Sequence, residues 1–244
     1  MISSTSSTYF FPNLFMSQQH IFREFDNGIL ALKAEVMTMA NLTLQIFERA
    51  IHSLCEHDIA LARAVIADDS DIDDLERRID QSGMQILARF HPVASDLRLV
   101  VTSMKIAHNL ERISDHAVGI AKRAKKLCKA TPLEEVALAK PLYAVANQLL
   151  RDALTAYENS DAKLGESLKP RDKELDRLHK QMIASLSGLL ENSNGRAECL
   201  LHLIIVARSL ERIGDLAVNI GEDAVFLGEA RNIRHEAKSP PPEN

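Results

Sequence analysis

Apolar residues recur three and four positions apart along most of the chain, which is the period of an amphipathic α-helix. Proline ends the second helical stretch at Pro92, and Pro170 is expected to kink or split the fifth, because proline cannot continue the hydrogen-bond ladder. Thr131-Pro132-Leu133-Glu134 matches a capping box with proline at the first helical position, which predicts a helix start. The pattern predicts long helices over residues 21–56, 58–90, 95–129, 142–159, 161–191 and 197–228.

An internal repeat organises these helices. The segment Leu110–Ile120 aligns with Leu210–Ile220 at an offset of 100, with 8 of 11 positions identical. Residues 69–75 align more weakly with residues 172–178 at an offset of 103. The alignment predicts two copies of a three-helix unit.

The scarcity of turn-forming residues supports the same fold class. The 244 residues include 9 Gly and 8 Pro, too few for an all-β protein, which needs a turn every 8–12 residues or so. We therefore expect an all-α protein, a tandem duplication of a three-helix bundle with six long helices. We expect a disordered or mis-annotated N-terminal extension at residues 1–19 and a first bundle at residues 20–130. A second bundle is expected at residues 131–228 and a polar Pro-rich tail at residues 229–244.

Charge and composition exclude several classes of protein. A net charge of −5 and the absence of Trp disfavour direct binding of nucleic acid. No stretch approaches 18 consecutive apolar residues, so no transmembrane segment is predicted. Three widely spaced cysteines suit a reduced cytoplasmic protein.

Acidic residues spaced four apart are the candidate functional residues. Each copy carries two such pairs, and each pair points to one side of its helix. Like charges at this spacing destabilise a helix by roughly 0.2–0.5 kcal/mol, so their recurrence in both copies indicates that something compensates. If the second and third helices pack antiparallel, each copy brings four carboxylates together. The pairs are Asp69 with Asp73, Glu111 with Asp115, Asp172 with Asp176, and Glu211 with Asp215.

A carboxylate cluster is costly unless protons, basic side chains or a cation neutralise it. Oxygen ligands suit hard or borderline ions such as Mg²⁺, Mn²⁺, Ca²⁺ or iron. The alternative is a solvated charged face, on which Arg77, Arg78, Arg112 and Arg212 form ion pairs worth well under about 1 kcal/mol each. From the residues alone, both interpretations stay open.

Motifs for catalysis are missing. A ferritin-like di-iron site uses Glu-x-x-His, and none of the 9 histidines has Glu three residues before it; the nearest approach is Asp176 with His179. His116 follows Asp115, but Leu216 takes its place in the second copy, so we expect His116 on the helix surface or supporting a ligand. The sequence also has no Walker A or GxGxxG motif, and it favours a protein that is not an enzyme.

Three segments resemble the PhoU family of bacterial phosphate-signalling accessory proteins: Glu111-Arg-Ile-Ser-Asp-His-Ala, Glu211-Arg-Ile-Gly-Asp-Leu-Ala and Pro92-Val-Ala-Ser-Asp-Leu-Arg98. The similarity covers roughly residues 18–228. It implies two similar three-helix bundles, each with a multinuclear metal site built from the acidic pairs above. The implied ions are Mg, Mn, Fe or Zn.

The resemblance also implies a function. PhoU proteins repress the phosphate-starvation response and are thought to link the ATPase subunit of a phosphate ABC transporter to a membrane sensor histidine kinase. We therefore expect a non-enzymatic cytoplasmic adaptor, compatible with a homodimer and with peripheral membrane association. A carboxylate-bridged metalloenzyme, phosphatase-like or oxidase-like, and a metal-free helical scaffold are the alternatives.

The two copies depart from each other. The second has Leu216 at the position of His116, and it lacks an Ala-Ser-Asp-Leu-Arg counterpart. Asp96 and Arg98 are weak candidates for a partner-binding surface. The competing interpretation, which we favour, is that they cap and charge-balance the start of the third helix.

Overall fold

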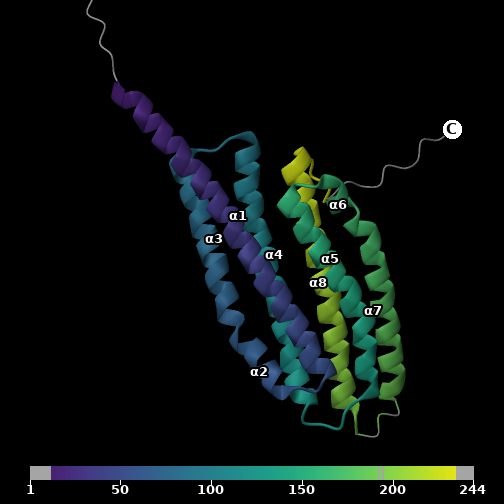
Figure 1. The fold of residues 1–244 in the computed structure, drawn as a ribbon. Coiled ribbons are helices and arrows are strands. Elements are labelled where there is room, and N and C mark those ends of the chain that lie inside the picture. Colours follow the sequence, from purple (N-terminus) through teal and green to yellow (C-terminus); the bar gives the residue numbers. More distant parts are fainter. Residues whose placement is uncertain (1–11, 192, 194, 235–244) are drawn as a thin grey trace, which may run out of the picture.

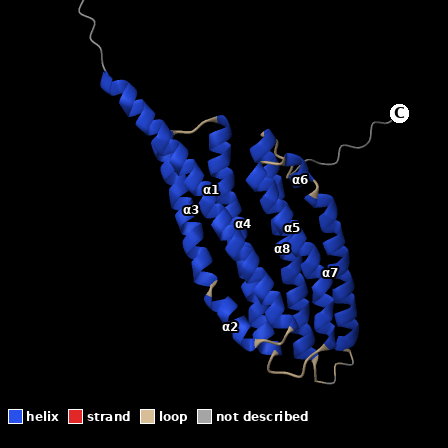
Figure 2. Ribbon diagram, viewed as in Figure 1, coloured by secondary structure: helices blue, strands red, loops and turns tan. Residues whose placement is uncertain are grey.

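The computed structural model describes residues 12–191, 193 and 195–234, and this part of the chain contains helices and loops but no strand (Figure 2). Two short helices, α2 (Ile59–Ala67) and α6 (Ala162–Glu166), precede α3 and α7, and a 3-10 helix, η1 (Glu134–Leu138), precedes α5. The expected all-α tandem duplication is confirmed. The long helices are α1 (Pro12–Cys55), α3 (Asp69–Phe90), α4 (Ala94–Leu127), α5 (Ala139–Asn159), α7 (Leu168–Leu190) and α8 (Ala197–Glu229).

The helices form two three-rod units that lie side by side (Figure 1). Helices α1, α3 and α4 make the first unit, and α5, α7 and α8 make the second. Helices α4 and α8 run antiparallel and pack against each other at the seam between the units (Figure 1). The apolar positions of the duplicated motif, Leu110 and Ile113 in α4 and Leu210 and Ile213 in α8, are completely buried. The acidic residues between them are therefore turned away from the core.

Both units build the turn before their second helix in the same way. His57 and Ser160 adopt left-handed backbone conformations with φ of 58° and 52°. The next residue caps the following helix: the Asp58 carboxylate accepts hydrogen bonds from the amides of Ala60 and Leu61, and Asp161 does the same for Leu164. Such capping satisfies amides that have no partner within the helix.

The second helix of each unit is broken at a position that the sequence did not predict. In the first unit the helix is interrupted at Asp68, where neither Gly nor Pro occurs, and the Asp68 carboxylate pairs with Arg49 of α1 at 2.5 Å. In the second unit the break lies at Ser167, while Pro170 sits in the first turn of α7. Proline is tolerated there because the first amides of a helix have no partner within it.

The capping box predicted at Thr131 is wrong. Residues 131–133 lie outside any helix, and the next element is the 3-10 helix η1, which has no side-chain cap. Leu133 packs against the core in an extended conformation, and this contact keeps the chain out of a helix for longer than the local sequence suggests.

The ends of the chain add two observations. Helix α1 begins at Pro12, so residues 12–19 of the expected N-terminal extension are helical, and residues 1–11 lie outside the described part. Of the expected tail, Glu229 ends α8, residues 230–234 are irregular, and residues 235–244 lie outside the described part.

By length and composition, the stretch Arg23–Cys55 of α1 is apolar enough to cross a membrane. Four apolar side chains of this stretch, Val36, Met39, Ile46 and Phe47, are fully buried in the core of the bundle. A core helix of a packed bundle meets the same criteria as a membrane span.

Candidate metal centres

Helices α3 and α4 bring the four predicted acidic residues of the first unit near one another; we call Asp69, Asp73, Glu111 and Asp115 the first quartet. Burial raises the pKa of Asp69, and the charges of Asp115 and Asp73 raise it further. The pKa of Glu111 is raised by burial and then by Asp115, with a smaller effect from Asp73. None of the four makes an ion pair with a basic side chain within the described residues. The charge of Lys122 offsets the shift of Asp69 in part, and His108 offsets that of Glu111, but both pKa values stay raised.

Helices α7 and α8 form the corresponding second quartet, Asp172, Asp176, Glu211 and Asp215. Burial raises the pKa of Asp172 to about 6, with added contributions from Asp215, Asp176 and Glu211. Asp215 also has a raised pKa because of burial, although Arg212 opposes the shift. All four side chains are half-buried, whereas two members of the first quartet are exposed.

Gly214 explains the tighter packing of the second quartet. A Cβ atom at this position would lie 2.2 Å from Leu175 Cδ2 and 3.1 Å from Asp172 Oδ1. The missing side chain lets α7 approach α8 closely and buries Asp172. In the first unit the same position is Ser114, which is buried and whose hydroxyl has no hydrogen-bond partner within the described residues.

The arginines of the duplicated motif behave differently in the two units. Arg212 pairs with Asp215 at 3.1 Å and with Glu211 at 3.5 Å, so it neutralises part of the second quartet. Arg112 makes no hydrogen bond or ion pair with any described residue, and Arg77 pairs with Asp74, outside the first quartet. Ion pairing thus accounts for charge balance in part of the second quartet and in none of the first.

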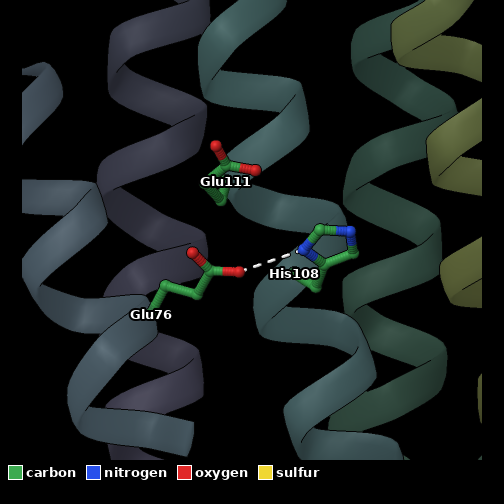
Figure 3. Close-up of side chains that lie close together, drawn as sticks. All are labelled: Glu76, His108 and Glu111. Atoms are coloured by element: carbon green, nitrogen blue, oxygen red, sulfur yellow. Dashed lines mark hydrogen bonds and ion pairs between the residues drawn. The ribbon is translucent and has the colours of Figure 1, made fainter.

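A group of three side chains that could ligate a metal extends the first quartet by one helical turn (Figure 3). His108 Nδ1 lies 3.0 Å from Glu76 Oε1, and one ligand atom from each of Glu76, His108 and Glu111 lies within 4.8 Å of the others. Glu76 also contributes to the raised pKa of Glu111. Of the residues predicted from the sequence, only Glu111 belongs to this group.

Glu76 and His108 were not predicted from the sequence, because the di-iron motif is Glu-x-x-His, whereas His108 and Glu111 form His-x-x-Glu. Helical spacing could have found both: Glu76 follows Asp69 by seven residues, and His108 precedes Glu111 by three. In the second unit the equivalent positions are His179 and Arg208. Because arginine does not ligate metals, this three-residue group has no counterpart there.

The seam between the units carries a cleft of about 370 Å³ beside the second quartet. Its lining includes Asp172, Asp215, Arg112, Arg212 and His116. Burial lowers the pKa of His116, and the charges of Arg112 and Arg212 lower it further. His116 is thus half-buried near both arginines at the centre of the molecule.

Asp96 and Arg98 lie at the start of α4. Asp96 occupies the first turn, where a carboxylate interacts favourably with the helix dipole. Arg98 Nε donates a hydrogen bond of 3.5 Å to the carbonyl of Leu227, near the end of α8. Arg98 therefore has a role in joining the two units.

Comparison with known proteins adds the following similarities. The PhoU domain family matches residues 36–124 and 141–224, one match in each half of the chain. The phosphate-specific transport system accessory protein PhoU homolog of Pseudomonas putida is 36% identical over 218 residues, which cover 88% of this chain and 85% of that protein. The homolog from Pseudomonas aeruginosa is 33% identical, covering 88% of this chain and 90% of that protein.

Solved structures agree. The crystal structure of PhoU from Pseudomonas aeruginosa superposes with a TM-score of 0.82 at 32% identity, covering 85% of this chain and 100% of that one. The phosphate transport system regulatory protein PhoU from Streptococcus pneumoniae superposes with a TM-score of 0.79 at 25% identity, covering 86% and 99%.

Proposed function

Because the chain belongs to the PhoU family, we propose that it is an accessory regulator of phosphate transport that acts as an adaptor and not as an enzyme. The observation that carries this proposal is the family match in both halves of the chain, each of which includes the duplicated Glu-Arg-Ile-x-Asp motif. In this role the protein represses the phosphate-starvation response from the cytoplasm. Its partners are the ATPase subunit of a phosphate ABC transporter and a sensor histidine kinase.

We also propose that each quartet holds one or more cations. The donor set fits: carboxylate oxygens from two facing helices suit Mg²⁺, Mn²⁺ or iron. Two observations support the fit, namely the raised pKa values of acids in both quartets and the absence of a direct ion pair between the first quartet and a basic side chain within the described residues. A bound cation would offset the repulsion and fix α3 against α4, and α7 against α8.

The first unit offers nitrogen as well as oxygen. His108 beside Glu76 and Glu111 gives a mixed ligand set that suits borderline ions such as Zn²⁺ or Fe²⁺. The second unit has Arg208 at the position of His108. We therefore propose that the two centres differ in the metals they prefer.

The adaptor role is tested by affinity capture from phosphate-replete cells. Wild-type protein is compared with a variant in which the first quartet is replaced by Asn and Gln, and with the same replacement in the second quartet. We expect each variant to lose a transporter or kinase component that wild-type protein retains, because the metal fixes the helices that present the binding surface. If folded variants retain every partner, the quartets are not the basis of the adaptor function.

Two further assays separate the alternatives. The carboxylate-bridged enzyme predicts phosphoester hydrolysis or oxygen consumption that is abolished by Asp115→Ala and Asp215→Ala, whereas the adaptor predicts neither activity. The metal-free scaffold predicts no change in thermal stability on chelation. We propose a homodimer as the assembly, which light scattering of the purified protein tests.

A further inference from the structure

The C-terminal half of the third helix reverses its charge between the two copies of the repeat. In the first copy this half of α4 is basic, and in the second copy the corresponding half of α8 is acidic and apolar. The basic residues are Lys122, Arg123, Lys125 and Lys126 in α4 and Lys129 just after it, and an offset of 100 aligns them with Glu222, Asp223, Val225, Phe226 and Glu229. Because α4 and α8 are antiparallel, the two halves lie at opposite ends of the seam (Figure 1).

The acidic end is occupied by the chain itself. Glu222 and Asp223 are 8% and 2% exposed, and the chain after α8 folds back so that Arg234 pairs with Asp223 at 2.6 Å. Lys169 pairs with Glu222 at 3.3 Å, and Lys105 of α4 lies 3.9 Å from Asp223. A groove of about 620 Å³ between α4 and α8 receives Arg234 at this end. One basic side chain from the segment after α8 thus pairs with the acids at this end of the seam.

No described residue pairs with the basic end in the same way. Lys122 and Lys126 are four residues apart on one side of α4, and Lys129 lies in the turn that follows the helix. All three are exposed, and we call them the basic stripe. None of the three makes a hydrogen bond or ion pair within the described part of the chain. Three acids lie near this end: Asp69 interacts with Lys122 at longer range, the charge of Asp58 acts on Cys128 beside Lys129, and Glu198 lies 3.6 Å from His202.

Exposed apolar side chains accompany the basic stripe. Leu201 and Ile205 of α8 are 49% and 39% exposed, although most large apolar side chains of the helix are buried. They flank His202, which lies near Lys126 and Arg123 of α4, since both charges act on its imidazole. The end of the seam therefore combines a row of positive charge with an apolar row on the neighbouring helix.

We propose that the basic stripe, together with Leu201 and Ile205, is a docking surface for an acidic amphipathic segment of a partner protein. The acidic end gives an example of charge pairing at the same seam, because there Arg234 from the segment after α8 pairs with Asp223 and Glu222. An anionic membrane fits less well, because the net charge of −5 repels an anionic surface and the basic stripe lies beside two exposed apolar side chains of the neighbouring helix. Apolar anchors beside charges are typical of helix-in-groove recognition.

The test uses purified full-length protein and a labelled 16-residue helical peptide, with Glu on one face and Leu on the other, in fluorescence anisotropy titrations. We expect wild-type protein to bind the peptide more weakly as salt is raised. Lys122→Glu/Lys126→Glu/Lys129→Glu should weaken binding by about tenfold or more, because three attractive charges become repulsive. The corresponding triple variant with Gln at the three positions removes the charges without reversing them, so it is less prone to misfold. It should lose an intermediate amount of affinity for the peptide.

In a matched control variant, three exposed lysines on α6 and α7, Lys163, Lys173 and Lys180, are replaced by Glu. This variant should change the affinity for the peptide by less than about twofold. Leu201→Ser/Ile205→Ser should weaken binding without changing its salt dependence. The proposal is overturned if wild-type protein does not bind the peptide or if the stripe and control variants bind equally. It is also overturned if the stripe reversal abolishes binding to phosphatidylglycerol vesicles and leaves peptide binding intact. Because the assay contains no transport component, its failure would leave the regulatory role untouched.

Discussion

Replacing Asp172 by Asn should stabilise the chelator-treated protein at pH 8. This carboxyl is half-buried among the other acids of the second quartet, and its pKa is raised from 3.8 to about 6. The folded state therefore favours the protonated form, and ionisation above pH 6 destabilises the protein. A shift of about two pKa units corresponds to roughly 3 kcal/mol, which solvent screening of a half-exposed group reduces to about 1–2 kcal/mol. Asn resembles the neutral acid, so the variant should gain about this amount.

The pH dependence has a defined direction. A carboxyl whose pKa is raised on folding contributes most stability below its unfolded pKa, and this contribution is lost as the pH rises through the folded value. The advantage of Asp172→Asn should therefore be largest at pH 8, fall to about half near pH 5, and vanish near pH 3.8. Urea unfolding of EDTA-dialysed protein at these pH values measures it. A neutral or destabilising effect at pH 8, or an advantage that grows on acidification, would refute the reasoning.

Three other outcomes are expected. Tyr157→Phe should destabilise the protein by about 1 kcal/mol because it removes the buried 2.7 Å hydrogen bond to Ser103 across the two units, and a double-mutant cycle with Ser103→Ala measures the coupling. Gly214→Ala should cost about 1–3 kcal/mol in urea unfolding because its Cβ would overlap a side chain of α7, whereas Gly188→Ala, with open space around it, should be neutral or slightly stabilising. His108→Ala should weaken Zn²⁺ binding by about tenfold or more in calorimetric titrations and leave Mg²⁺ binding unchanged, because imidazole is a ligand for Zn²⁺ and not for Mg²⁺.

The helices were predictable because each carries a long stripe of apolar residues and because the two copies of the repeat show the same pattern. The duplicated motif located both central helices: Leu110 and Leu210 are buried, as their positions in the stripes predict. The interruption at Asp68 could not be predicted, because it accompanies an ion pair with Arg49, which belongs to a different helix. A contact between elements leaves no signal in the local sequence.

The candidate site was predictable in part for the same reason. Spacing of four residues placed each acidic pair on one side of its helix, and the repeat showed which pairs correspond. Residue spacing does not show how deeply a side chain is buried. The greater burial of Asp172 follows from the close packing at Gly214, which only the structure shows. The spacing of His108 and Glu111 on one helix could have indicated His108, whereas its contact with Glu76 of another helix emerged only from packing.

The central claim is that each quartet binds cations, and elemental analysis of protein purified under metal-replete conditions tests it most directly. Three proteins are compared: wild type, a variant with the first quartet changed to Asn and Gln, and a variant with the second quartet so changed. The account predicts that wild-type protein retains metal after extensive dialysis, and that each variant loses the share held by its own unit. Wild-type protein that retains no metal, or a metal content that neither set of substitutions changes, would contradict it.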